Sequence, residues 1–348
     1  MDMPRIGEDL EDFLRAGTPA DLARVLRAIA KVARPLAHRI RRGRLAKLQA
    51  PDGSGQDSIV PMTLDMIALD MIAQEAFSNG LKGAGVRAVL TEKRADALAL
   101  DANGTLLVAI SALDGASNID ANIPVGAFFS VLDAPVGEFA NGHFLQAGVK
   151  QRAAGLLIYG PQAAFVLTTG AGVHIATLDP DSNTFRISEI GLRIPDGVSE
   201  FAIDAANARH WPEPVRAYVE DCLEGADGPR GRNFDMRWVA SSVADVYRIL
   251  ASGGVCLYPG DSRDGHTHGR PRLLTEANPI AFLIEQAGGV AIDGFDRVLE
   301  IAPTSVAMRT PLIFGSSEKV ERIARYFSEG GVLADNSPLF ATRGLLRR

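Results

Sequence analysis

The chain has 348 residues, of which 47% are hydrophobic and 22% charged, and its formal net charge is −6. This balance is ordinary for a soluble globular protein that is long enough to form two domains. The negative charge argues against nucleic acid as a partner, and no apolar run approaches the roughly 20 residues that a membrane-spanning helix needs. The charged first 15 residues lack the apolar core of a signal peptide, and Cys222 and Cys256 stand in no metal-type spacing. These absences predict a cytoplasmic protein with free thiols and no membrane partner.

The amino-terminal part of the chain predicts two helices and then a strand. Over residues 20–48, apolar side chains recur at three- and four-residue steps, which is typical of an amphipathic helix. The basic cluster Arg39 to Arg44 near its end is interpreted as a solvated helix end, with anion binding as the alternative. A turn-rich stretch over 51–57 precedes a second predicted helix over 64–79. The apolar run over 86–90 predicts a strand.

The middle and carboxyl-terminal parts predict strands and then a mixture of helices and strands. Short apolar runs separated by turns fill residues 105–180, including strands at 105–110, 155–159, 164–168 and 173–177. Further along, helices are expected over 212–223, 243–251, 279–287 and 318–327, and strands over 255–258 and 310–315. This mixture predicts an α/β protein of two packed units with a boundary near residue 195.

The most informative stretch follows the apolar run over 105–110. Residues 111–120 read Ser-Ala-Leu-Asp-Gly-Ala-Ser-Asn-Ile-Asp. A carboxylate at the end of a strand, here Asp114, holds a hard cation through oxygen. The glycine and the small residues that follow let backbone N–H groups approach phosphate oxygens. This arrangement suits a metal-bound phosphate.

The same stretch resembles the class I fructose-1,6-bisphosphatases of the lithium-sensitive, magnesium-dependent sugar phosphatase superfamily, whose pattern is Asp-Pro-Leu-Asp-Gly-Ser-Ser-Asn-Ile-Asp. Residues 237–246, Arg-Trp-Val-Ala-Ser-Ser-Val-Ala-Asp-Val, resemble the family's Arg-Tyr-Val-Gly-Ser-Met-Val-Ala-Asp-Val. Further segments match in order, at 201–211, 253–259, 272–279, 285–289 and 311–316. The resemblance implies a layered α/β/α/β/α sandwich of the sugar-phosphatase type. It also implies a regulatory-type α/β domain over 1–195, which carries most metal ligands, and a sugar-phosphate-binding α/β domain over 196–348.

The resemblance implies an activity as well as a fold. Magnesium-activated water would hydrolyse fructose 1,6-bisphosphate to fructose 6-phosphate and phosphate, in gluconeogenesis or Calvin-type carbon metabolism. The partners implied are a sugar bisphosphate, Mg²⁺ and other copies of the chain in a dimer or tetramer.

Residues in the site are assigned by the same resemblance. The metal ligands are Glu92, Asp114, Glu276 and the carbonyl of Leu113, and the catalytic residues are Asp65, Glu92 and Asp114. The substrate-binding residues are Gly115, Ser117, Asp204, Arg237, Trp238, Tyr258 and Arg270. In the family, the arginine matched by Arg237 reaches the sugar phosphate of a neighbouring subunit. Asp65 by itself also fits the first turn of a helix, so its place before the Glu92 strand is what favours a role in the site.

Several positions depart from the family pattern. Ser111 replaces a ligand aspartate, and a hydroxyl is a poor substitute for a carboxylate toward magnesium. Lys93 replaces a second acidic residue. Together, Ser111 and Lys93 make the site about three charges more positive than the family pattern, and Lys93 is alternatively a tethered cation beside the phosphate. Asp204 replaces an asparagine, and its charge repels phosphate unless a proton or cation neutralises it. These changes leave two alternatives: a catalytically impaired paralogue that binds sugar phosphate or a partner subunit, and a phosphatase of another sugar bisphosphate such as sedoheptulose 1,7-bisphosphate.

Overall fold

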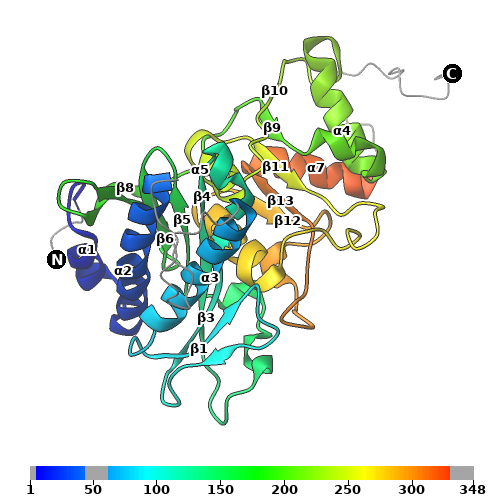
Figure 1. Ribbon diagram of the computed structural model, residues 1–348. Coiled ribbons are helices and arrows are strands. Elements are labelled where there is room, and N and C mark those ends of the chain that lie inside the picture. The colour runs from blue at the N-terminus through cyan, green and yellow to red at the C-terminus, as the bar shows by residue number, and fades with distance from the viewer. Residues whose placement is uncertain (1–4, 44–61, 330–348) are drawn as a thin grey trace.

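The structure is a computed structural model that describes residues 5–43 and 62–329, with side chains from residue 69 onward in the second range (Figure 1). Its first sheet contains β1 (Val86–Thr91), β2 (Leu98–Ala99), β3 (Leu106–Asp114), β4 (Val125–Asp133), β5 (Ala153–Tyr159), β6 (Ala163–Thr168), β7 (Val173–Asp179) and β8 (Thr184–Leu192). The spatial order is β2-β1-β3-β4-β5-β6-β7-β8. All neighbours are antiparallel except β1 and β3, which run parallel. The strands predicted between residues 86 and 177 are therefore confirmed, and β3 continues past the predicted end at residue 110.

A second, smaller sheet follows in the chain. Its strands are β9 (Glu200–Ala202), β10 (Asp235–Met236), β11 (Val255–Tyr258), β12 (Val290–Ile292) and β13 (Leu312–Gly315). They lie in the order β10-β9-β11-β13-β12, with β11 and β13 antiparallel in its middle. The strands predicted at 255–258 and 310–315 are thus the central pair of this sheet.

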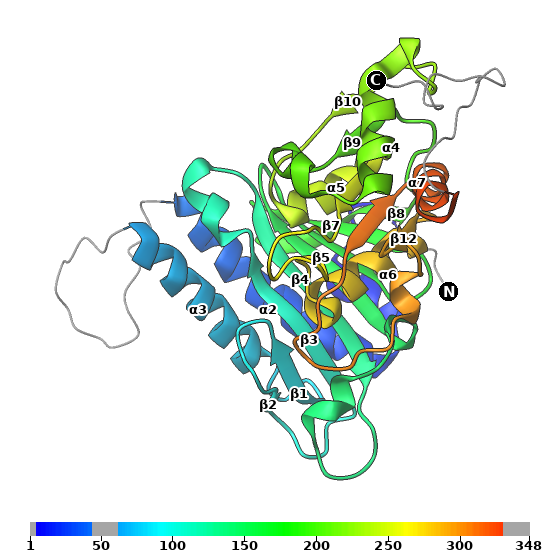
Figure 2. The ribbon, with the colours of Figure 1, turned by 90° about the vertical axis from the view of Figure 1, so that its right-hand side faces the viewer.

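Helices lie on both sides of each sheet and give five layers. They are α1 (Leu10–Gly17), α2 (Ala20–Arg42), α3 (Met62–Gly80), α4 (Glu213–Glu224), α5 (Ser242–Ser252), α6 (Asn278–Gln286) and α7 (Ser317–Glu329). Figure 2 shows α2 and α3 on one side of the molecule, α4 and α7 on the other, and α5 and α6 between the two sheets. This arrangement confirms the predicted α/β/α/β/α sandwich.

The sequence produces these layers because side chains alternate along a strand. In β4, Phe129 belongs to the core shared with α1, α2 and α3, whereas its neighbour Phe128 belongs to the core shared with α5 and α6. On the outer face of the second sheet, Tyr218 of α4 and Tyr326 of α7 meet with ring centroids 5.6 Å apart. The central strands are apolar on both faces because both faces are covered.

The helix predicted over 20–48 begins as expected at Ala20 but ends at Arg42. Residues 44–48 and the turn-rich stretch 51–57 lie outside the described residues. Helix α1 was not predicted, because its eight residues bury only Leu10 and Leu14 and are too few to show a period. Within the described residues, no helix is both long and apolar enough to cross a membrane. The division of roles between residues 1–195 and 196–348 stays a prediction.

Candidate active site

Strand pairing assembles the acidic edge of the first sheet. Because β1 and β3 are parallel, with Thr91 opposite Ile110, their carboxyl ends meet at the same edge. Glu92 directly follows β1, and the Ala112 N–H donates to its Oε2 at 3.2 Å. Three of the predicted metal ligands, Glu92, Leu113 and Asp114, are therefore brought together by the backbone.

A bulge then redirects the end of β3. Ser111 pairs with Phe128 and Asp114 with Gly126, so β3 carries an extra residue relative to β4. The next residue, Gly115, has a φ of +75°, which favours glycine, and it precedes the 3₁₀ helix η2 (Ala116–Ala121). The bulge and the left-handed turn release Asp114 from the strand and aim it at the layer between the sheets.

Asp114 is held there by the start of α5. The Ser242 hydroxyl donates a hydrogen bond to Asp114 Oδ1, and the Val243 N–H also donates to this carboxylate. A negative charge is favoured at a helix N-terminus. Ser242 stands where the family segment has methionine, and the sequence reasoning missed it. The signal that was available is the Ser-Ser pair before a helix, which is typical of capping.

Glu276 approaches the same place from a π-helix, η7 (Leu273–Ala277), which packs against β3 and β4. The Arg272 N–H donates to Glu276 Oε2 at 2.8 Å. Burial, together with the negative charges of Asp114 and Glu92, raises the pKa of Glu276 to about 7. A π-helix was not expected here, although such turns are frequent at functional sites.

The acidic groups fit a divalent cation in their chemistry. Burial raises the pKa of Glu92 to about 7 and also raises the pKa of Asp114, because ionised carboxylates are poorly solvated there. Oxygen ligands with excess negative charge are the type that a hard cation prefers. In the part of the chain that the structure describes, however, no three His, Cys, Asp or Glu side chains are grouped closely enough to hold a metal. Ser111, only 2% exposed, occupies the position where the family pattern supplies one more carboxylate.

A cavity of about 480 Å³ opens over Asp114. Eight of the predicted site residues line it: Asp114, Gly115, Ser117, Asp204, Trp238, Tyr258, Arg270 and Glu276. These residues come from segments that are far apart in the sequence, so the fold joins the acidic edge to the predicted sugar-phosphate groups.

Other predicted residues lie outside the cavity lining. Glu92 and Leu113 are buried behind it. Arg237 is on the surface, where its guanidinium pairs with Glu200 at 3.5 Å and Asp235 at 3.2 Å. Asp65 belongs to α3, but its side chain lies outside the described residues.

Lys93 does not line the cavity. Its side chain is 59% exposed, and its Nζ lies 3.5 Å from Asp70 Oδ2. In the structure this lysine therefore pairs with an acid on α3, away from the position beside the phosphate that the sequence alternative assigned to it.

Hydrogen bonds orient the sugar-phosphate side of the cavity. The Tyr258 hydroxyl donates to Asp245 Oδ2 at 3.0 Å, and the rings of Trp238 and Tyr258 lie 5.3 Å apart. The carboxylate of Asp204 accepts from the Ala206 N–H at 3.2 Å and from the Asn207 amide at 2.5 Å. Asp204 therefore acts as the N-terminal cap of the 3₁₀ helix η5 (Ala205–His210).

Arg309 is a cavity residue that the sequence analysis missed. Its guanidinium donates to the Arg270 carbonyl, and its charge lowers the pKa of Glu276. It thus places a second guanidinium beside Arg270 in the lining. It belongs to an irregular segment with no motif, so only the final arrangement identifies it.

The raised pKa values predict that the metal-free protein loses stability as the pH rises. Glu92 and Glu276 have pKa values of about 7 when folded and an ordinary value of 4.5. The folded state then binds more protons between these values, so the stabilisation is complete below about pH 4.5 and is lost through pH 7. We expect the free energy of unfolding in EDTA to fall by roughly 2–4 kcal/mol between pH 5.5 and 8. Urea unfolding at several pH values measures this, and a flat profile, or the same slope in Glu276→Gln, would contradict it.

Comparison with known proteins identifies the family. The profile described as the N-terminal domain of fructose-1-6-bisphosphatase matches residues 7–189, and the profile of its C-terminal domain matches residues 194–328. The chain is 46% identical over 347 residues to a "Fructose-1,6-bisphosphatase class 1" of Methylorubrum extorquens, covering 98% of each chain. It is 47% identical over 329 residues to the protein of that name from Paracoccus denitrificans, covering 94% of this chain and 96% of the relative.

A solved structure agrees with these relatives. The holo form of Leishmania major fructose-1,6-bisphosphatase superposes with a TM-score of 0.82 at 27% identity, covering 93% of this chain and 99% of that chain. The chain therefore belongs to the class 1 fructose-1,6-bisphosphatase family.

Proposed function

We propose that this protein hydrolyses fructose 1,6-bisphosphate to fructose 6-phosphate and phosphate with the help of bound Mg²⁺. The family uses divalent metal ions. The observation that carries the proposal is one cavity in which two half-buried carboxylates, Asp114 and Glu276, lie with two guanidinium groups, Arg270 and Arg309. Carboxylates suit a metal ion, and guanidinium groups suit phosphate oxygens.

The acidic edge would hold the metal through Glu92, Asp114, Glu276 and the carbonyl of Leu113. When bound, the ion supplies charge neutralisation for the phosphate and a more reactive water. The protein positions these ligands through the β3 bulge and the Ser242 hydroxyl. We assign to Asp65 a place near the attacking water.

The remaining residues would bind the sugar phosphate. Gly115 and Ser117 are small and leave room for the phosphate that is cleaved. Arg270 and Tyr258 suit the second phosphate, because a guanidinium fork binds two phosphate oxygens and a phenol donates one hydrogen bond. Trp238 provides a flat ring beside Tyr258, and Asp204 caps the loop that borders the sugar.

Arg237 supports a proposal about assembly. It lies on the surface, more than half exposed, and carries two acidic neighbours. We propose that it reaches the sugar-phosphate cavity of a second copy in a cytoplasmic homodimer or homotetramer. This role is consistent with its absence from the lining of its own cavity.

One observation favours a second candidate function. Ser111 is buried within the metal-binding edge, where its hydroxyl replaces a charged ligand. This single change would weaken metal binding, and the protein would then be a paralogue that binds sugar phosphate but hydrolyses it slowly. A related substrate, such as sedoheptulose 1,7-bisphosphate, would instead need changes in the sugar loop around Asp204.

The test is phosphate release over a Mg²⁺ titration, with fructose 1,6-bisphosphate and sedoheptulose 1,7-bisphosphate as parallel substrates. We expect metal-dependent release that is faster with fructose 1,6-bisphosphate. Faster release with the seven-carbon sugar would reassign the substrate. If calorimetry detects binding of fructose 1,6-bisphosphate but no phosphate appears with Mg²⁺ or Mn²⁺, the impaired paralogue is the correct interpretation.

A further inference from the structure

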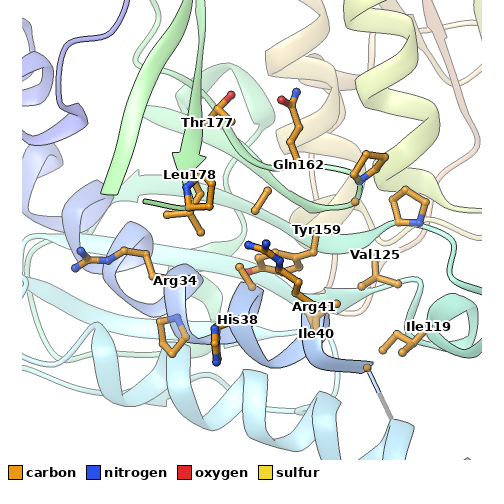
Figure 3. Close-up of a pocket in the computed structure, with 18 of the residues that line it drawn as sticks. Arg34, His38, Ile40, Arg41, Ile119, Val125, Tyr159, Gln162, Thr177 and Leu178 are labelled. Carbon is orange, nitrogen blue, oxygen red and sulfur yellow. The ribbon is translucent and has the colours of Figure 1, made fainter. Parts of the chain in front are cut away.

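The arginines near the surface of this protein differ in how they are held. Figure 3 shows Arg34 and Arg41 beside a second cavity, of about 1440 Å³, between α2 and the first sheet. Neither of them forms an ion pair with an acidic side chain that the structure describes. Arg237, which directly follows β10, is 54% exposed, and yet two carboxylates hold its guanidinium. Its pairing is therefore a specific feature of the second sheet and does not follow from exposure alone.

The backbone fixes Arg237 to its neighbouring strand. β9 and β10 are parallel, with Glu200 opposite Asp235. The Arg237 N–H donates to the Phe201 carbonyl at 2.9 Å, so the pairing continues one residue beyond β10. Residues two apart in a strand share a face of the sheet. Asp235, Arg237 and Glu200 therefore lie on the same face.

Glu200 joins two arginines. Its Oε2 accepts a hydrogen bond from Arg248 Nη1 at 2.9 Å, and its Oε1 lies 3.5 Å from Arg237 Nε. The side chains of Glu200 and Arg248 are only 21% and 17% exposed, so water and salt screen this pair less than a pair on the surface. Arg248 therefore holds the carboxylate in one orientation, with its second oxygen facing Arg237.

The elements that carry this pair are themselves fixed. Arg248 belongs to α5, whose first turn is tied to Asp114 through Ser242. On the strand side, Gly254 has a φ of +91°, and a Cβ at this position would lie 2.8 Å from the Glu200 carbonyl oxygen. Glycine permits this close approach, so the chain before β11 packs directly against the Glu200 backbone. Glu200 thus has little freedom to move away from Arg237.

The contacts of Arg237 leave its outer edge open to a phosphate. A guanidinium has five N–H donors. Nε faces Glu200, and one N–H of Nη2 donates to Asp235 at 3.2 Å. Nη1 and the other N–H of Nη2 form no hydrogen bond within the described structure, and these two nitrogens are the pair that can bind two phosphate oxygens at once. Because Arg248 balances the charge of Glu200, the carboxylate can orient Arg237 and leave it positively charged.

We propose that Glu200 is a positioning residue for Arg237, and that Arg248 fixes Glu200 in this role. The two residues present the outer edge of the Arg237 guanidinium to the sugar phosphate in the cavity of a second copy. An arginine that is already ordered loses less side-chain entropy when it binds, so Glu200 increases the affinity without contacting the substrate. The inference rests on the proposed function, which assigns Arg237 to a neighbouring cavity.

A double-mutant cycle on the full-length protein tests this role. Calorimetry in EDTA, where metal-dependent hydrolysis does not proceed, gives the dissociation constant of fructose 1,6-bisphosphate. We expect Arg237→Gln to weaken binding at least about tenfold, and Glu200→Gln about three- to tenfold. In the Arg237→Gln background, Glu200→Gln should weaken binding by less than about 1.5-fold, because a positioning residue has no effect without the group that it positions. Glu189→Gln, which removes an exposed carboxylate from β8, is the matched control and should leave binding unchanged.

Turnover provides a second readout. With Mg²⁺ bound, Glu200→Gln and Arg248→Gln should each raise KM about three- to tenfold and change kcat by less than about twofold, because the contact is equally strong in the ground state and the transition state. Sedimentation velocity and thermal unfolding of each variant show whether the assembly and the fold are intact.

Three results would overturn the inference and leave the proposed function in place. Glu200→Gln could bind the substrate as tightly as the natural protein while Arg237→Gln does not, the two effects could multiply in the double variant, or Glu200→Gln alone could dissociate the oligomer. If Arg237→Gln binds normally, the assignment of Arg237 to a neighbouring cavity is wrong and the inference fails with it. A protein that shows the expected cycle by calorimetry but releases no phosphate refutes the proposed hydrolysis and keeps the positioning role.

Discussion

The Asp114→Asn variant is expected to lose phosphate release by about 1000-fold or more while it keeps its fold. Changes to groups that only support a metal ligand typically cost about 10–100-fold, and this substitution removes the charge of a ligand itself. Asparagine has nearly the same size, and its amide oxygen still accepts the bonds from Ser242 and Val243. The start of α5 therefore remains capped.

Initial rates at saturating Mg²⁺, together with urea unfolding, test this expectation. Asp227→Asn is the matched control, since Asp227 is an exposed residue of the 3₁₀ helix Gly225–Asp227, which does not line the catalytic cavity, and the change removes the same charge. A variant at position 114 that retains a tenth of the natural rate would exclude Asp114 as a metal ligand. A variant that unfolds would show instead that the charge is needed for the junction with α5.

The Ser111→Asp variant should tighten the apparent Mg²⁺ affinity by about 10–100-fold, because it returns a carboxylate to the metal edge. Position 111 lies in β3, at the edge where Glu92 follows β1, and it is 2% exposed. Without metal, one more buried carboxylate adds repulsion, so the variant should unfold at a lower temperature in EDTA. With Mg²⁺ the variant should instead unfold at a higher temperature than the natural protein, because the added carboxylate binds the ion and the serine hydroxyl binds it poorly.

Thermal unfolding with and without Mg²⁺ measures this reversal independently of turnover, and a phosphate assay measures the metal requirement. Ser111→Asn provides the control, because it has the same size and no charge. If Asp and Asn behave alike in both measurements, Ser111 is not at a ligand position. If the natural protein already saturates at low Mg²⁺, its serine is tolerated and the departure from the family pattern has little consequence.

Local features of the chain could be predicted, and long-range contacts could not. Helix α2 was predictable because its apolar period is strong, and β5, β6 and β7 because each is a short apolar run between turns. The extension of β3 to Asp114 was not, because Ser111 and the bulge interrupt the apolar pattern.

The candidate site shows the same division. The resemblance supplied residue types for most of the cavity wall, from Asp114 to Glu276. It did not supply the hydrogen bond from Ser242 to Asp114, which joins residues 128 apart in the chain, or the pairing of Lys93 with Asp70. Arg309 could not be predicted either, because a lone arginine in an irregular segment belongs to no sequence pattern. Such contacts depend on how the layers pack, which no short stretch of sequence records.

The bond between Asp114 and the start of α5 has a consequence for the way inactive relatives would be recognised. The Asp114 carboxylate is a proposed metal ligand, and its hydrogen bond with Ser242 also joins the first sheet to the middle helix layer. Natural selection for a stable scaffold would keep this aspartate after selection for hydrolysis had ceased. The residue at position 111 has no such additional structural role, because a buried serine there still pairs with Phe128 in the sheet. For the proposed metal site, we therefore expect position 111 to change earlier than Asp114 in relatives that no longer hydrolyse a phosphate.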